Sequence, residues 1–167
     1  IVSQGLDKRL ALGIIKITGH KTWRIIAGFT AISALLSSFI GEHTVAAMMM
    51  PVGLTLVRYA HKDPRKVRGL TAALLFSIAY GATIGSIGTP SGGGRNVIMM
   101  NYWAEFGSGY VSYLEWMKYV YPMVLVQIPF TVLILLWTFK PEQTNLDSAV
   151  RKLVIDVAHA GKVKAKE

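Results

Sequence analysis

The chain has 167 residues, a formal net charge of +9, no cysteine and a hydrophobic content of 52%. Without cysteine it has neither a disulfide framework nor a thiolate metal site. Its apolar residues lie in long runs and its mean hydropathy is +0.42, a composition typical of a bilayer protein and not of a soluble fold. Each span of the hydrocarbon core needs about 20 apolar residues, so only a few spans fit.

The basic residues lie between the apolar runs. Three clusters hold all but Arg95 and Lys118: Lys8, Arg9, Lys16, Lys21 and Arg24; Arg58, Lys62, Arg65, Lys66 and Arg68; Lys140, Arg151, Lys152, Lys162, Lys164 and Lys166. This distribution follows the positive-inside rule for cytoplasmic segments and argues against nucleic acid as a partner. We therefore expect a multi-pass integral protein of the cell membrane, with the lipid bilayer as its surroundings.

Residues 1–20 are expected to form an amphipathic helix at the cytoplasmic interface. Leu6, Leu10, Ile14 and Ile17 recur at helical spacing, and charged residues fall on the other faces. The segment lacks an initiator Met, a compact apolar run and a small-residue cleavage site. We expect no signal peptide, and the missing Met indicates a fragment.

Residues 21–60 are predicted to form a re-entrant helical hairpin. The apolar stretch from Trp23 to Tyr59 is interrupted only around Ser37 to Thr44. As one helix it would be about 55 Å long, too long for a single span. Folded back at the polar segment, it gives arms of roughly 13 and 15 residues, each too short to cross. Basic residues at both ends place both ends on the cytoplasmic side.

Residues 69–106 are predicted to form a broken transmembrane helix. The apolar segment Gly69 to Ile87 stops at a stretch with Pro90 and three consecutive glycines, then resumes from Asn96 to Phe106. A further transmembrane helix over 116–139 returns the chain to the cytoplasm. Residues 140–167 are expected to be a cytoplasmic helix or linker, with an apolar stripe at Leu146, Val150, Leu153 and Val154. The predicted fold class is all-α integral membrane.

The two breaks are the main candidate site. Discontinuous helices in transporters direct N–H groups and about half a positive charge at anions near the midplane. The helix starts are predicted near Thr44 and Asn96, and the carbonyls around Ser37 and Gly88 are candidates for holding a small cation. The alternative is that both breaks are packing kinks in ordinary spans.

Glu42 and His43 lie at the predicted hairpin tip, where an ionisable group is costly unless it finds partners. Glu42 is either a proton or cation site or a counter-ion for Arg95, which in turn offers a bidentate partner for a substrate carboxylate. His43 is either part of the site or a neutral, hydrogen-bonded side chain inside the bundle. The sequence has no catalytic triad, carboxylate pair or metal cluster, so we expect neither an enzyme nor a cofactor beyond the coupling ion.

Two stretches resemble the divalent anion/sodium symporter family, within the superfamily of dicarboxylate, citrate, sulfate and arsenite carriers. The segment from Ser37 to Pro51 is similar to the first hairpin of that family, and Ile87-Gly88-Thr89-Pro90 is similar to its Ile-Gly-Thr-Pro-Pro-Asn break. The likeness covers nearly the whole chain and corresponds to the first of two inverted repeats. It implies a sodium-coupled carrier of small anions such as di- and tricarboxylates, with a second repeat as partner and a homodimer with an elevator motion.

By this resemblance, Ser37 and Gly88 match cation-site positions, and Thr89 with Pro90 matches the substrate-facing loop. The family tip reads Ser-Asn-Thr where this chain has Gly41, Glu42 and His43, and Asn96 is a candidate for the missing amide of the break. The candidate substrate-binding residues are Glu42, His43, Thr44, Thr89, Pro90, Ser91, Arg95 and Asn96. The candidate cation-binding residues are Ser37, Gly41, Glu42 and Gly88. Proton coupling through Glu42, or a small membrane subunit that transports nothing, are the alternatives.

Overall fold

The computed structural model describes residues 6–61, 63–107 and 109–159, and within them it contains helices and connections but no β-sheet. The α-helices are α1 (Leu6–Thr18), α2 (Thr22–Ile40), α3 (Glu42–Ala60), α4 (Arg68–Ile87), α5 (Gly94–Phe106), α6 (Tyr113–Phe139) and α7 (Asp147–His159), with 3-10 turns η2 (Pro64–Val67) and η3 (Pro90–Gly92). The expected all-α class is confirmed. Helices α2, α4 and α6 are long and apolar enough to cross a membrane.

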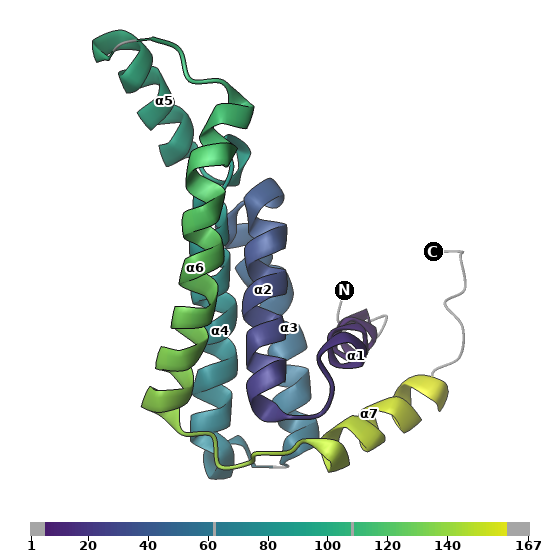
Figure 1. The fold of residues 1–167 in the computed structure, drawn as a ribbon. Coiled ribbons are helices and arrows are strands. Elements are labelled where there is room, and N and C mark those ends of the chain that lie inside the picture. The colour runs from purple at the N-terminus through teal and green to yellow at the C-terminus, as the bar shows by residue number, and fades with distance from the viewer. Residues whose placement is uncertain (1–5, 62, 108, 160–167) are drawn as a thin grey trace.

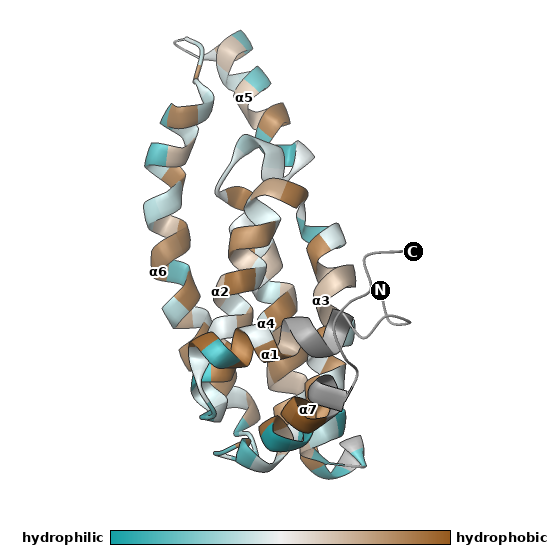
Figure 2. Cartoon of the chain, turned by 90° about the vertical axis from the view of Figure 1, so that its right-hand side faces the viewer, coloured by the Kyte–Doolittle hydropathy of each residue, from teal (hydrophilic) through white to brown (hydrophobic). Residues whose placement is uncertain are grey.

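The helices α2, α3, α4 and α6 lie side by side as a bundle, with α1 and α7 beside its lower half (Figure 1). The connection between α2 and α3 lies at the level of η3, while α5 and the upper end of α6 extend beyond it. Hydrophobic residues line much of α2, α4 and α6, and hydrophilic residues gather at the lower connections (Figure 2). The exposed apolar side chains of α6, such as Leu125, Leu133 and Trp137, provide a face suited to lipid.

The hairpin is interrupted at a single residue. Gly41, with φ +93°, separates α2 and α3, which have 19 residues each. The predicted arms of 13 and 15 residues were therefore too short. At 1.5 Å per residue, α2 and α3 are each about 28 Å long, which is close to the thickness of the hydrocarbon core. The helix runs through Ser37 and Ser38, whose hydroxyls lie 3.2 and 3.0 Å from the Ala34 carbonyl oxygen one turn back.

Helices α2 and α4 approach closely through small residues. A Cβ on Gly81 would lie 2.5 Å from the Thr30 carbonyl oxygen, and one on Gly85 would lie 1.9 Å from that of Ala34. Small residues at this spacing let two membrane helices bring their backbones together. Ser37 and Ser38 use this proximity to donate to the Ala82 and Gly85 carbonyls of α4, at 2.6 and 2.8 Å. The hairpin and the broken helix are therefore packed as one unit.

The other predicted boundaries need smaller corrections. Helices α3 and α5 begin at Glu42 and Gly94, each two residues before the predicted start. Helix α6 begins at Tyr113 instead of Trp116, because Ser112 and Glu115 form a capping box at 3.3 and 2.8 Å. Of the residues in the two apolar stripes, Leu146, Val150 and Leu153 are buried, whereas Ile17 and Val154 are exposed, at 82% and 46%.

A strap, defined as residues 140–146, ties the lower ends of α2 and α4 together. Glu142 accepts hydrogen bonds from the N–H groups of Gly69 and Leu70 at 2.8 and 3.0 Å. Thr22 donates its amide to the Thr144 carbonyl at 3.1 Å and its hydroxyl to the Gln143 carbonyl at 2.5 Å. The first turns of α2 and α4 are thereby capped from the connection between α6 and α7.

Candidate anion site

Two helix starts meet at one cavity. The N-terminus of α3, with Gly41 as its N-cap, and that of α5, with Gly93 as its N-cap, line a cavity of about 460 Å³. Both N-cap residues are glycines, so neither supplies a side-chain acceptor to the N–H groups of the first turn. The lining residues are Ile40, Gly41, Glu42, His43, Thr44, Ser91, Gly92, Gly93, Gly94 and Arg95. The sequence prediction that the two breaks come together is thus consistent with the fold.

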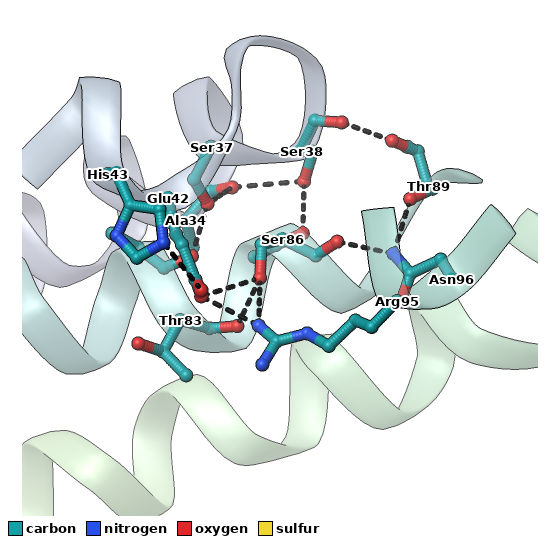
Figure 3. A network of polar contacts seen from close by, with 12 residues as sticks. Ala34, Ser37, Ser38, Glu42, His43, Thr83, Ser86, Thr89, Arg95 and Asn96 are labelled. Atoms are coloured by element: carbon teal, nitrogen blue, oxygen red, sulfur yellow. Dashed lines mark hydrogen bonds and ion pairs between the residues drawn. The ribbon is translucent and has the colours of Figure 1, made fainter. Parts of the chain in front are cut away.

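An ion pair joins the two breaks. Nη2 of Arg95 lies 2.6 Å from Oε2 of Glu42, and the side chains are 53% and 22% exposed respectively (Figure 3). The other oxygen of Glu42 lies 3.7 Å from Nε2 of His43, whose side chain is 97% exposed. Of the two hypotheses for Glu42, this geometry matches the one in which its carboxylate is the counter-ion of Arg95. The location of His43 at the cavity rim does not match the reading of a side chain inside the bundle.

Ser86 contacts both members of this ion pair, and this role was not predicted from the sequence. Its hydroxyl accepts from Nη2 of Arg95 at 2.8 Å and lies within donating distance of Glu42, at 3.1 Å, and of the Thr83 carbonyl, at 2.8 Å. A serine in an apolar helix is usually bonded to its own backbone, so the residue gave no distinct signal. Its place one turn before the break was the available clue.

The loop between α4 and α5 is held by buried polar side chains behind the cavity. Thr89 donates to the Ser38 carbonyl and accepts from the Gly92 amide at 3.1 Å. Asn96 donates through its side-chain amide to the carbonyls of Ser86 and Thr89, at 2.7 Å each. Thr89, Pro90 and Asn96 are buried and absent from the cavity lining. In this structure they shape the loop, whereas Glu42, His43, Thr44, Ser91 and Arg95 line the cavity.

Two of the four candidate cation residues, Ser37 and Gly88, are absent from the cavity lining, although the Gly41 amide donates to the Ser37 carbonyl at 3.2 Å. Ser37 is buried between α2 and α4 with two carbonyl acceptors within reach of its hydroxyl, and the amide of Gly88 donates to the Gly85 carbonyl at 2.9 Å. Only Gly41 and Glu42 line the cavity. Over the residues that the structure describes, no group of three or more His, Cys, Asp or Glu is placed to hold a metal ion. A sodium site at these positions stays a prediction.

Helix α6 supports the break from the side. The phenol of Tyr113 lies 2.8 Å from the hydroxyl of Ser91, and the indole of Trp116 donates to the Ile87 carbonyl at 3.0 Å. Neither contact was predicted, because aromatic residues are common at membrane interfaces and the sequence does not indicate which group they bond to.

The cavity has an excess of positive charge. Each helix start contributes about half a positive charge, and the charges of Arg95 and Glu42 cancel, which leaves about one positive charge facing the cavity. Backbone N–H groups at helix starts and a guanidinium are the groups that bind oxyanions. The arrangement is therefore suited to one carboxylate or a similar anion.

Comparison with known proteins gives one family and a consistent set of relatives. The family model described as citrate transporter (CitMHS) matches residues 1–163. Sodium-dependent high-affinity dicarboxylate transporter 3 of Caenorhabditis elegans is 28% identical over 163 residues, which cover 89% of this chain and 29% of that protein. Sodium-dependent dicarboxylate transporter SdcS of Staphylococcus saprophyticus is 30% identical over 175 residues, or 97% and 33% of the two chains.

SdcS of Staphylococcus aureus is 27% identical over 169 residues, which cover 97% of this chain and 32% of that protein. The chain thus spans about a third of the length of the curated relatives it matches. These matches confirm the resemblance and the prediction that the chain is not an enzyme. The chain belongs to the citrate transporter family.

Proposed function

We propose that this chain forms one half of the substrate pathway of a sodium-coupled secondary transporter for di- and tricarboxylates. One observation carries the proposal: two helix starts without side-chain caps and the guanidinium of Arg95 converge on a single cavity. Secondary transporters bind anionic substrates at such discontinuous helices. The cavity between α3 and α5 is the proposed seat for one substrate carboxylate.

The proposed placement in the bilayer follows the lengths of the elements. Helix α6, with 27 residues, is about 40 Å long and is taken as a full span. The hairpin tip lies at the level of η3, short of the upper ends of α5 and α6 (Figure 1). This supports a re-entrant hairpin of α2 and α3 whose tip stays inside the membrane, and a broken span made of α4 and α5. Their lower ends, with the strap, face the cytoplasm in this proposal, as the basic clusters favour.

The coupling ion and the substrate class are proposed from the relatives, which are described as sodium-dependent dicarboxylate transporters. A second repeat is proposed to complete the site, since the cavity balances about one negative charge and a dicarboxylate has two. A homodimer with an elevator motion is proposed on the same resemblance.

The test is uptake by the full-length protein in proteoliposomes. Radiolabelled succinate and citrate are offered with an inward sodium gradient, with a potassium gradient of equal strength, and with a proton gradient without sodium. We expect saturable uptake with the sodium gradient alone. Uptake driven by protons without sodium would overturn the coupling, and no uptake by folded protein under any gradient would favour a non-transporting membrane subunit.

A matched pair of variants ties uptake to the site. Arg95→Gln removes the guanidinium from the cavity and is expected to abolish succinate uptake. Lys118→Gln removes a positive charge from the exposed surface of α6 and is expected to leave uptake close to wild type. Equal losses in the two variants would mean that general charge, and not the cavity, explains the effect.

A further inference from the structure

Within the described part of the chain, Arg95 makes its side-chain hydrogen bonds through one nitrogen. Both hydrogen bonds, to Oε2 of Glu42 at 2.6 Å and to Oγ of Ser86 at 2.8 Å, come from Nη2. Figure 3 shows the other terminal nitrogen of the guanidinium without a dashed line to any of the residues drawn. A guanidinium has five N–H donors in a planar fork and binds a carboxylate best through two parallel bonds. The pair with Glu42 uses only part of that capacity.

Ser86 keeps its hydrogen bonds if Glu42 leaves. Its hydroxyl has one hydrogen and two acceptors within reach, the Thr83 carbonyl at 2.8 Å and Glu42 at 3.1 Å. When that hydrogen goes to Thr83, Ser86 still accepts from Arg95. Loss of the Glu42 contact therefore leaves no unsatisfied hydroxyl at this position, which lowers the cost of removing Glu42.

The Glu42 carboxylate also has an alternative partner, His43, if it leaves Arg95. Its second oxygen lies 3.7 Å from Nε2 of His43, which is 97% exposed at the cavity rim. Glu42 is in the first turn of α3, where the positive helix end stabilises a carboxylate whether or not Arg95 is its partner. The cavity beside the pair, about 460 Å³, has room for a small carboxylate.

We propose that Glu42 is a built-in competitor for the substrate: its carboxylate occupies Arg95 when the cavity is empty, and a substrate carboxylate displaces it and takes the fork in two-bond geometry. The identity of the displacing substrate rests on the proposed function, but the exchange is a property of these side chains alone. Glu42 then sets substrate affinity, because each binding event must first break the Glu42–Arg95 pair.

The first experiment replaces the lost carboxylate with a small one. Full-length Glu42→Ala is purified in detergent, and its unfolding midpoint is measured with sodium acetate and with sodium chloride at matched concentration. We expect acetate to raise the midpoint of Glu42→Ala saturably above the chloride value. The same comparison should give a much smaller difference for wild type and for Glu105→Ala, in which acetate must displace Glu42, and no difference for Glu42→Ala/Arg95→Gln; Glu105→Ala removes an exposed carboxylate from α5.

The second experiment uses an isosteric variant, so that the test survives if Glu42→Ala fails to fold. Glu42→Gln is expected to bind radiolabelled succinate with a Kd about fivefold lower than wild type, the factor that corresponds to loss of a partly exposed ion pair. An unchanged or higher Kd in folded Glu42→Gln would overturn the proposal, as would an equal acetate effect in wild type and in Glu42→Ala.

The two proposals fail separately. If wild type transports no carboxylate but acetate stabilises Glu42→Ala through Arg95, the exchange stands and the proposed function falls. If wild type transports succinate and acetate has no selective effect on folded Glu42→Ala, the proposed function stands and the exchange is wrong.

Discussion

The indole Nε1 of Trp116 donates a hydrogen bond to the carbonyl of Ile87 across 3.0 Å. Ile87 is the last residue of α4, and the final carbonyls of a helix have no partner within that helix. Trp116 is the fourth residue of α6. A side chain from the neighbouring helix therefore satisfies the end of the broken helix beside the candidate site.

Replacing Trp116 tests this contact. Trp116→Phe keeps the ring but removes the N–H donor, and we expect a loss of about 1–2 kcal/mol in the free energy of unfolding, because the Ile87 carbonyl loses its partner in an apolar setting. The measurement is the unfolding midpoint of full-length protein in detergent. Trp137→Phe, at a position that is 78% exposed, is the control and should have little effect. Equal losses at the two positions would contradict the role assigned to the hydrogen bond.

Thr89 should be required for the shape of the break. Its hydroxyl donates to the Ser38 carbonyl and accepts from the Gly92 amide. Thr89→Val is isosteric but loses both bonds, and we expect it to cost about 1–3 kcal/mol. Thr89→Ser retains the hydroxyl and should stay near wild type. Amide hydrogen exchange at Gly92, measured in all three proteins, should be faster only in the valine variant, and unchanged protection there would rule out the predicted role.

Gly85 should accept no side chain. A Cβ at this position would lie 1.9 Å from the Ala34 carbonyl oxygen, and that atom is backbone in a packed helix. Gly85→Ala is expected to force α2 and α4 apart at a cost of about 1–3 kcal/mol or more. Gly13→Ala is the matched control, because a Cβ on Gly13 meets nothing within 4 Å and alanine favours the helix. A Gly85→Ala protein as stable as Gly13→Ala would contradict the close packing.

We expect the stability of the lower end of the bundle to depend on pH through Glu142. Partial burial acts to raise the pKa of Glu142, but backbone hydrogen bonds, including those from Gly69 and Leu70, outweigh it and hold the pKa below the ordinary value of 4.5. A carboxyl whose pKa is lowered by folding contributes stability above its unfolded pKa and loses that contribution as the pH falls through its folded pKa.

Glu142→Gln should therefore be less stable than wild type at pH 7 by about 1 kcal/mol, a small value because the carboxylate is exposed to water. The difference should shrink as the pH is lowered below 4.5. Unfolding midpoints of both proteins from pH 7 downward give the comparison. A difference that is constant with pH would show that the charge on Glu142 is not the cause.

Much of the helical order could be predicted because it depends on local patterns. The apolar run after Gly69 and the glycine stretch behind Pro90 indicate a broken helix directly. The extent of the break after α2 was misjudged, because Ser37 and Ser38 look like helix breakers until the carbonyls of α4 are placed beside them. The pattern identifies polar residues in an apolar segment, but whether they end the helix depends on a partner that is distant in the chain.

The same distinction applies to the site. Glu42 and Arg95 could be matched from the sequence because opposite charges in apolar segments are costly unless they are paired. The bridge through Ser86 and the buried positions of Thr89 and Asn96 could not, since these depend on how the loop turns between α4 and α5. Sequence motifs therefore located the break without separating cavity-lining side chains from those that hold the loop.

The strap has a consequence for the order in which the protein is made. Glu142, which caps the first turn of α4, follows Gly69 by 73 positions. Ribosomal synthesis proceeds from the N-terminus, so the first turn of α4 must wait for the whole of α6 before it meets its cap. The start of α2 waits likewise for Gln143 and Thr144. The lower end of the bundle is therefore closed only after the helices that form the cavity have been translated.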